Sequence, residues 1–322
     1  MVAIGIDLGG TSARAAVIDA AGLIRGVAKR VHDRASPDRM ADILRELAVE
    51  ALGLSKHPES DVAAVGVGLA GQIHSNAGVV AVGPNLGWRG VPFGRMLRAR
   101  LRWPVMVMND LSAAAWGERA AGAGEGRDDV ALFFVGSGIG SALILGGRLY
   151  EGATGVAGEI GHVKVEPGGR LCGCGERGCL EAYCGGHNLS LQVAEAIAAG
   201  RSTSLAPLAA GGRWVTALEI EREALGGDGL ARELWDRCAK LLPQAIANLA
   251  TLLNPARVLL GGGVLGTSPE LKRVVRERSR ELTLAAARET LEIVDATLGD
   301  DAGVVGAGLR ALENAASLAE AF

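Results

Sequence analysis

The chain is poor in aromatic residues and proline, and it has no long hydrophobic run. Aromatic side chains make up 3% of its 322 residues and there are only 10 prolines, although 49% of the residues are hydrophobic. The apolar content is therefore mostly Ala, Val, Leu and Ile, which suits helices packed on sheets. Because no apolar stretch reaches about 18 residues, we expect no membrane-spanning helix.

Neither sign of charge dominates the sequence. The 33 Lys and Arg residues nearly balance the 36 Asp and Glu residues, the net charge is −3, and no basic block stands out. We therefore expect no nucleic-acid partner. The first residues, MVAIGIDLGG, lack the basic region and apolar core of a signal peptide, so we expect a cytoplasmic protein.

Cysteine is scarce as well, but three of the five cysteines lie close together in the stretch GEIGHVKVEPGGRLCGCGERGCLEAY. His162, Cys172, Cys174 and Cys179 offer one imidazole and three thiolates, which match a closed, four-coordinate structural zinc site. Free buried thiols or a redox pair are the alternatives. Free thiols would not be expected to cluster, and C-x-C-x4-C differs from the C-x-x-C redox spacing. The cluster therefore predicts structural zinc.

Glycine, by contrast, is abundant, and three glycine groups follow apolar strands among the 48 glycines of the chain. Their exposed backbone N–H groups can bind phosphate oxygens, and Asp7, just before the first group, could hold Mg²⁺. An ordinary hairpin explains any one of them equally well, and GSGIG lacks the GK[ST] of a Walker loop. Together they indicate a nucleotide cleft. The candidate residues are Gly9, Gly10, Thr11, Gly136, Ser137, Gly138, Gly261, Gly262 and Gly263.

The spacing of apolar residues predicts alternating strands and helices, with a linker near 122–127. Each half begins with a strand, a glycine turn and a second strand, and facing sheets would place the two turns across one cleft. Pro243 should kink or split the helix that contains it. Strands are expected at 2–7, 12–18 and 23–31, antiparallel and joined by tight turns, and at 61–69, 104–108, 257–260 and 293–297, with a hairpin at 129–147. Helices are expected at 37–52, 111–121, 180–199, 230–253 and 301–318.

Three carboxylates are candidates for chemistry. Asp110 follows a strand and precedes a helix, so it could accept the proton of a substrate hydroxyl during phosphoryl transfer. An ordinary helix N-cap is an equally good local explanation. Glu159 and Glu181 lie beside the cysteine cluster, where a metal would fix them rigidly enough to bind sugar hydroxyls; exposed surface glutamates are the alternative.

Five motifs, in order along nearly the whole chain, resemble those of the ROK family of repressors, open reading frames and sugar kinases. DLGGT resembles its first phosphate motif, and NDLSAAAWGE its catalytic stretch. GSGIG resembles the second phosphate motif, and LLGGGV the adenosine motif. GEIGH followed by CGCGERGCLE resembles the sugar-and-zinc signature, which is the most specific of the five.

The resemblance implies an α/β chain with the actin-like ATPase fold, in which two RNase H-like domains enclose a cleft. Residues 1–120 with 301–322 would form the small domain and residues 121–300 the large one. It also implies ATP-dependent phosphorylation of a hexose at the 6-hydroxyl, with Mg²⁺ on the ATP phosphates. Asp110 would be the base. The sugar would be held by Gly71, Asn85, Asn109, Asp110, Glu159, His162 and Glu181, with His162 also a zinc ligand.

Two departures concern the substrate and the catalytic stretch. Ser112 stands where the family often has Asn, which puts one contact near the base in doubt. Ala70-Gly71 replaces the Pro-Gly of many members, as the glucokinase-like branch also allows, and Trp88 and Trp116 fit that branch. We therefore expect glucose as the substrate. Fructose, mannose, N-acetylmannosamine and N-acetylglucosamine remain alternatives, and the donor could be ATP or polyphosphate.

The non-enzymatic members of the family give the rival interpretation. Its repressors carry a helix-turn-helix domain ahead of the first phosphate motif, which here begins within the first ten residues, so we expect none. A non-catalytic sugar sensor remains an alternative, although a sensor would not need both Asp7 and Asp110. From the family's habit we expect a homodimer or homotetramer.

Overall fold

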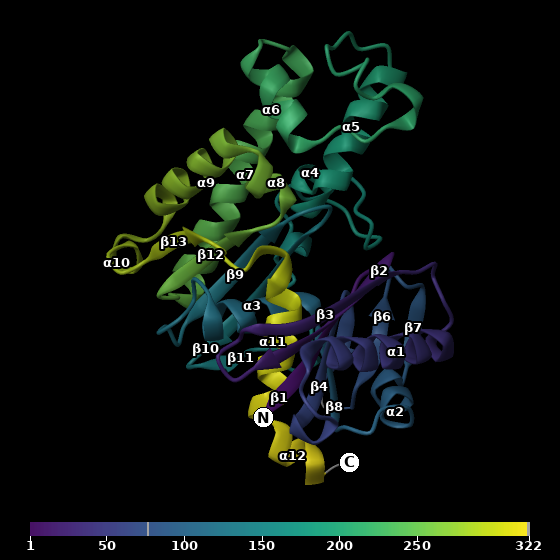
Figure 1. Cartoon of the computed structure of the whole chain (residues 1–322). Helices are drawn as coiled ribbons and strands as arrows, with labels where there is room; N and C mark the ends of the chain where they lie inside the picture. The colour runs from purple at the N-terminus through teal and green to yellow at the C-terminus, as the bar shows by residue number, and fades with distance from the viewer. Residues whose placement is uncertain (76, 321–322) are drawn as a thin grey trace. The chain divides into compact units, whose positions relative to one another are not determined.

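The computed structural model describes residues 1–75 and 77–320. The chain divides into two compact units: a first of Met1–Val130, Ala142–Ala157 and Ala296–Phe322, and a second of Ala131–Ser141 and Gly158–Asp295. Each contains strands and helices (Figure 1). Among the described residues, no helix combines the length and the apolar character that crossing a membrane requires.

A five-stranded sheet forms the centre of the first unit, in the order β3-β2-β1-β4-β8. Its strands are β1 (Val2–Leu8), β2 (Ser12–Asp19), β3 (Ile24–Val31), β4 (Val62–Leu69) and β8 (Val105–Asn109). The first three are antiparallel, as the sequence predicts, whereas β4 runs parallel to β1 and β8 parallel to β4. Parallel neighbours bring the carboxyl ends of these strands to one edge, where DLGGT and Asn109 follow.

Helices bury both faces of this sheet because successive side chains of a strand point to opposite sides. Ile4 and Ile6 pack in one core with Leu44 of helix α1 (Pro37–Ser55). On the other side, α11 (Ala302–Glu313) lies beside β1 and β2, so that the yellow C-terminal helix adjoins the purple N-terminal strands in Figure 1. There a Cβ on Gly5 would lie 1.8 Å from the carbonyl oxygen of Val304.

Helix α3 (Asp110–Ala121) packs just as closely on α11, since a Cβ on Gly306 would lie 1.7 Å from the carbonyl oxygen of Ala113. The single helix expected at 301–318 is instead two, because α11 ends at Glu313, Asn314 is its C-cap, and α12 (Ala315–Glu320) follows. The first unit therefore contains the junction of β8 and α3, its glycine turn and the last helices of the described chain.

A second, three-stranded sheet in the first unit was not anticipated. It consists of β5 (Gln72–His74), β6 (Val79–Gly83) and β7 (Trp88–Val91), and α2 (Phe93–Arg98) follows it. These strands are short and separated by glycine turns, so no apolar period is long enough to detect. The short 3-10 helix Glu59–Asp61 precedes β4.

The other five-stranded sheet of the described chain has the order β11-β10-β9-β12-β13. Its strands are β9 (Val130–Val135), β10 (Ile139–Leu145), β11 (Arg148–Leu149), β12 (Arg257–Gly261) and β13 (Glu292–Asp295). The GSGIG turn joins the neighbouring strands β9 and β10, and β12 runs parallel to β13. The glycine turns after β9 and β12 consequently follow two adjacent strands.

The helices of the second unit correct one expectation and exclude one of the two outcomes expected at Pro243. The helix expected at 180–199 is interrupted at Gly185 into α4 (Glu181–Cys184) and α5 (Gly186–Ala198). Conversely, α7 (Gly229–Leu253) runs through Pro243 without being split. Buried residues on both sides of this proline, such as Leu242 and Ile246, hold the two halves of α7 in the core.

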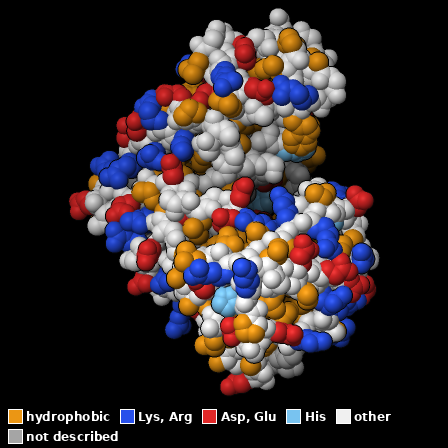
Figure 2. Space-filling view, in the orientation of Figure 1, with side chains coloured by type: hydrophobic (Ala, Val, Ile, Leu, Met, Phe, Trp, Pro, Cys, Tyr) orange, Lys and Arg blue, Asp and Glu red, His pale blue; other side chains and the backbone are white. Residues whose placement is uncertain are grey.

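The remaining helices of this unit are α6 (Ala217–Leu225), α8 (Gly263–Thr267), α9 (Pro269–Leu282) and α10 (Ala285–Arg288). Three 3-10 helices complete the described elements, at Ile160–His162, Ala210–Gly212 and Gly299–Asp301, the last of them in the first unit. On the face drawn in Figure 2, acidic and basic side chains are interspersed on the surface.

Candidate functional site

The junction of β8 and α3 presents Asn109 and Asp110 side by side, in roles that differ from expectation. The N-cap of α3 is Asn109, not Asp110: Asn109 has an extended backbone, and its Oδ1 accepts hydrogen bonds from the backbone N of Leu111 (2.9 Å) and Ser112 (3.1 Å). Asp110 is the first helical residue, and its Oδ1 accepts from Leu111 N at 2.9 Å. The Asp110 carboxylate therefore lies at the N-terminal end of α3, beside the backbone N–H groups of its first turn.

This geometry also bears on the serine that departs from the family pattern. Ser112 contributes its backbone N–H to the cap, and any non-proline residue supplies that group equally. Replacing the usual asparagine by Ser112 therefore leaves the hydrogen bonds that orient Asn109 intact.

Gly71 lies next to Asn109, whereas Asn85 lies next to the first glycine turn. The side-chain amide of Asn109 donates to the carbonyl oxygen of Gly71 at 3.0 Å. A Cβ on Gly71 would lie 2.6 Å from the carbonyl oxygen of Val82, so a larger residue would displace the chain here. Asn85 adjoins the first glycine turn, because a Cβ on Gly10 would lie 3.2 Å from the Cβ of Asn85.

Asp7 precedes that turn and lies half-buried beside α11. A Cβ on Gly303 would lie 3.4 Å from its Cγ. Desolvation, followed by repulsion from the carboxylate of Asp110, raises the pKa of Asp7 from 3.8 to about 6, although the positive charge of Arg14 opposes the shift. A desolvated carboxylate beside others of the same charge is a favourable ligand for a hard cation, so Asp7 fits the role of holding Mg²⁺.

The turn after β9 is tied to Glu181 and to the start of α5. Gly136 N donates to Gly138 O at 2.9 Å, which closes the turn, and Ile139 N donates to Glu181 Oε2 at 2.8 Å. His187 N of α5 donates to Ser137 O at 2.9 Å. These bonds explain the interruption at Gly185, because an unbroken helix would not direct the first N–H groups of α5 at the turn.

The third glycine run adjoins the same turn. Gly262 has a φ of 92°, and a Cβ there would lie 2.4 Å from the carbonyl oxygen of Val135. A Cβ on Gly186 would lie 2.9 Å from Gly136 O and 3.2 Å from a methyl carbon of Val264. Three glycine-containing segments therefore meet backbone to backbone in the second unit, which leaves room for a phosphate chain to approach the N–H groups.

The predicted zinc ligands converge. One ligand atom from each of His162, Cys172, Cys174 and Cys179 lies within 4.8 Å of all the others, and the cysteines form no disulfide. The sulfurs of Cys174 and Cys179 are 3.7 Å apart, and Cys172 Sγ is 3.8 Å from His162 Nδ1. Zn–S bonds of about 2.3 Å place two sulfurs of a tetrahedral site about 3.8 Å apart, so the group fits zinc.

Charges around these ligands also favour a cation. Burial raises the pKa of the Cys172 thiol to about 12, a cost that a bound cation would offset. Burial also raises the pKa of Glu159, whose carboxylate lies 3.8 Å from His162 Nε2. Glu181 Oε1 is 3.8 Å from Cys172 Sγ, so both glutamates adjoin the ligand group and it restrains their positions.

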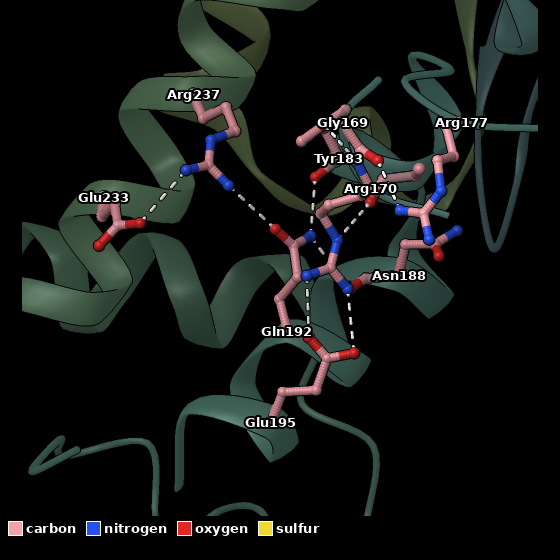
Figure 3. A network of polar contacts seen from close by, with 10 residues as sticks. Gly169, Arg170, Arg177, Tyr183, Asn188, Gln192, Glu195, Glu233 and Arg237 are labelled. Atoms are coloured by element: carbon pink, nitrogen blue, oxygen red, sulfur yellow. Dashed lines mark hydrogen bonds and ion pairs between the residues drawn. The ribbon is translucent and has the colours of Figure 1, made fainter. Parts of the chain in front are cut away.

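A polar network that was not anticipated attaches the cysteine loop, residues 170–179, to α4 and α5 (Figure 3). The Arg170 guanidinium forms two hydrogen bonds with the Glu195 carboxylate, at 2.8 and 3.1 Å, and Arg170 N donates to the Tyr183 hydroxyl at 2.7 Å. Gln192 Nε2 donates to Tyr183 O at 3.1 Å, and Arg237 donates to Gln192 Oε1 at 3.2 Å. Tyr183, one of only two tyrosines, was the available sequence signal for this network.

Two α/β units, each with a glycine turn between strands of its central sheet, place the chain in the actin-like ATPase fold class, and the solved structures below confirm this expectation. The ROK family model matches residues 3–313, so the chain belongs to the ROK family.

Named relatives agree with this membership. The crystal structure of the ROK hexokinase from Thermus thermophilus aligns with a TM-score of 0.84 at 31% identity, covering 98% of this chain and 100% of that one. The ROK family glucokinase from Streptomyces griseus, in complex with glucose and AMPPNP, aligns with a TM-score of 0.79 at 34% identity, covering 97% and 100%. The glucokinase of Halalkalibacterium halodurans is 34% identical over 310 residues, 95% of this chain and 93% of that protein.

Proposed function

We propose that this ROK family chain is a hexokinase-type sugar kinase that transfers a phosphoryl group from ATP to the 6-hydroxyl of glucose. The observation that carries the proposal is the junction of β8 and α3, where a carboxylate and a carboxamide are presented together at a helix N-terminus. The glucokinase names of relatives that match over nearly their whole length support glucose. Kinases for N-acetylmannosamine, N-acetylglucosamine, mannose or fructose are the alternatives.

Asp110 is assigned as the general base that accepts the proton of the 6-hydroxyl as the oxygen attacks phosphorus. Its hydrogen bond from Leu111 N orients the carboxylate, and Asn109, fixed by its own cap bonds, can donate to or accept from a sugar hydroxyl. Gly71 and Asn85 are assigned to the sugar from the first unit. Glu159, His162 and Glu181 are likewise assigned to the sugar.

ATP is assigned to the glycine turns. Gly9, Gly10 and Thr11 are assigned to phosphate, and so are Gly136, Ser137 and Gly138. The third run, Gly261 to Gly263, would adjoin the adenosine, because glycine permits close approach of the backbone. Asp7 would hold Mg²⁺, which neutralises charge on the phosphates when it is bound.

Zinc is assigned a structural role at the four convergent ligands. A site with three thiolates and one imidazole keeps no open coordination position, so the metal would stabilise the loop and take no part in the reaction. Because Glu181 contacts both Cys172 and the N–H of Ile139, the loop would also hold the sugar-binding and phosphate-binding groups in register.

Three further assignments follow from family membership. We propose that residues 1–120 with 301–322 act as the small catalytic domain and residues 121–300 as the large one. We also propose a homodimer or homotetramer that works in the cytoplasm on a small sugar and ATP, without nucleic acid or membrane.

The decisive experiment is a coupled ADP-release assay with Mg-ATP against glucose, mannose, fructose, N-acetylglucosamine, N-acetylmannosamine and no sugar, with Asp110→Asn as the negative control. We expect glucose to give the highest kcat/KM. A higher value for an N-acetylated sugar would keep the mechanism and refute the substrate. Activity no greater than the blank with every sugar, repeated with polyphosphate as donor, would refute the kinase proposal in favour of a sugar sensor.

A further inference from the structure

Glu118, in the last turn of α3, is a fully buried carboxylate to which the proposed reaction assigns no role; its side chain is 0% exposed. Oε1 accepts hydrogen bonds from the backbone N of Thr297 (2.8 Å) and Leu298 (2.7 Å). Oε2 accepts from the backbone N of Ala123 (2.9 Å) and from the Thr297 hydroxyl (3.2 Å). Four hydrogen bonds offset the cost of burying an ionised group, so the carboxylate is held in one orientation.

The residues that bond to Glu118 lie in two connecting segments. One precedes the point where the chain first passes from the first unit into the second, and the other follows the point where it returns for the last time. Ala123 lies between α3 and β9, and the chain first passes into the second unit after Val130. Thr297 and Leu298 follow the last return, at Ala296. Gly122, the first residue of the stretch 122–127, packs directly on this carboxylate, because a Cβ there would lie 2.4 Å from Glu118 Oε2.

We propose that Glu118 is a positioning residue for phosphoryl transfer, which fastens both of these connecting segments to the helix that begins with Asp110. The two carboxylates lie on one helix, eight residues and therefore about 12 Å apart along its axis. Because α3 is a single rigid element, a displacement of either connector is passed to Asp110 through Glu118. The inference rests on the proposed function, in which Asp110 is the base.

Only a carboxylate can hold both connectors. Oε1 accepts from the backbone of the returning segment, and Oε2 accepts from the backbone of the departing segment as well as from the Thr297 hydroxyl. The amide of Glu118→Gln has a single acceptor oxygen, and its NH₂ group would face backbone N–H groups that it cannot accept from. The variant therefore keeps nearly the same volume and releases one connector.

Glu221 provides a matched control. It is also buried, at 3% exposure, and it lies in α6 of the second unit. Its oxygens accept from the backbone N of Leu271 (2.7 Å) and Glu270 (3.3 Å), at the start of α9. Glu221→Gln therefore disrupts the same kind of buried cap at a place far along the chain from both connectors.

The test compares kcat, the KM of glucose and the KM of ATP for the wild type and the two variants, at a temperature where all three are folded. Both variants should unfold at a lower temperature than the wild type. Only Glu118→Gln should lose kcat, by about tenfold or more, because small misplacements of a catalytic group are costly; Glu221→Gln should stay within about twofold of the wild type. Equal kcat values for the two variants would overturn the inference.

Hydrogen exchange on the wild type keeps the proposal testable if Glu118→Gln does not fold. Binding of glucose with a non-hydrolysable ATP analogue should increase the protection of the amides of Ala123, Thr297 and Leu298, while those of Glu270 and Leu271 stay unchanged. Unchanged protection at the three connector amides would refute the positioning role. A wild type that is inactive with every sugar would instead refute the proposed function, so the two failures are distinguishable.

Discussion

Replacing Asp7 by asparagine should make the ligand-free protein more stable while it impairs the reaction. In the folded chain the pKa of Asp7 is raised from 3.8 to about 6, first by desolvation and then by the charge of Asp110. A raised pKa means that the folded state holds the proton more tightly than the unfolded state does. Stability contributed by this group is therefore greatest below about pH 4 and is lost as the pH rises towards 6.

The magnitude follows from the shift. About two pK units correspond to about 3 kcal/mol of unfolding free energy, fully lost at pH 8 and about half lost at pH 5. An asparagine at position 7 has nearly the same shape and carries no charge, so it avoids this cost. We expect Asp7→Asn to raise the free energy of unfolding by up to about 3 kcal/mol at pH 8 and by about half as much at pH 5.

The assay is urea unfolding at these two pH values in magnesium-free buffer, avoiding the calculated pI near 6.0, where solubility is lowest. Asp33→Asn is the control, because that aspartate is exposed, is not among the charges that shift the pKa of Asp7, and should change stability little when neutralised. A gain that is the same at both pH values, or a loss at pH 8, would refute the reasoning. The same variant should lower kcat, because an amide is a weaker ligand for Mg²⁺ than a carboxylate.

Three other substitutions test the assigned roles. Asp110→Asn keeps an acceptor for Leu111 N, so it should bind glucose normally and lose at least about 100-fold in kcat; a smaller loss would exclude Asp110 as the base. Cys174→Ser should release zinc, measured with a chromogenic chelator, whereas Cys238→Ala, at a buried thiol outside the ligand group, should retain it; equal zinc contents would exclude Cys174 as a ligand. Glu181→Gln, which keeps an acceptor for Ile139 N, should raise the KM of glucose about tenfold and that of ATP much less; equal effects would place Glu181 outside the sugar site.

Features set by local sequence were predictable. The three antiparallel strands at the N-terminus follow from alternating apolar residues between tight turns, and the four zinc ligands follow from the chemistry of thiolates and imidazole at close spacing. The strand that ends at Asn109 and the helix that follows were also anticipated. In each case the residues that decide the structure are neighbours in the sequence.

Features that depend on contacts between distant residues were not predictable. The cap of α3 was assigned to Asp110, although Asn109 alone has both the extended backbone and the side-chain bonds of a cap. The interruption at Gly185 depends on Ser137, about fifty residues earlier. The spacing of apolar residues along a helix gives no information about such a contact. Glu118 is the last residue of the motif NDLSAAAWGE, and nothing near it in the sequence indicates that it binds Thr297 and Leu298, some 180 residues away.

The close approach of α11 to the first sheet and to α3 has an evolutionary consequence. At Gly5, Gly66 and Gly306 a single added carbon would lie within 2.0 Å of a backbone oxygen, so no side-chain rotation could make room for it. A chain with 48 glycines and so few aromatic rings builds part of its core from main chain rather than from large side chains. Compensating mutations elsewhere cannot rescue such positions, because backbone atoms cannot be made smaller. In a saturation mutagenesis library these glycines should therefore tolerate fewer replacements than the leucines and valines packed around them.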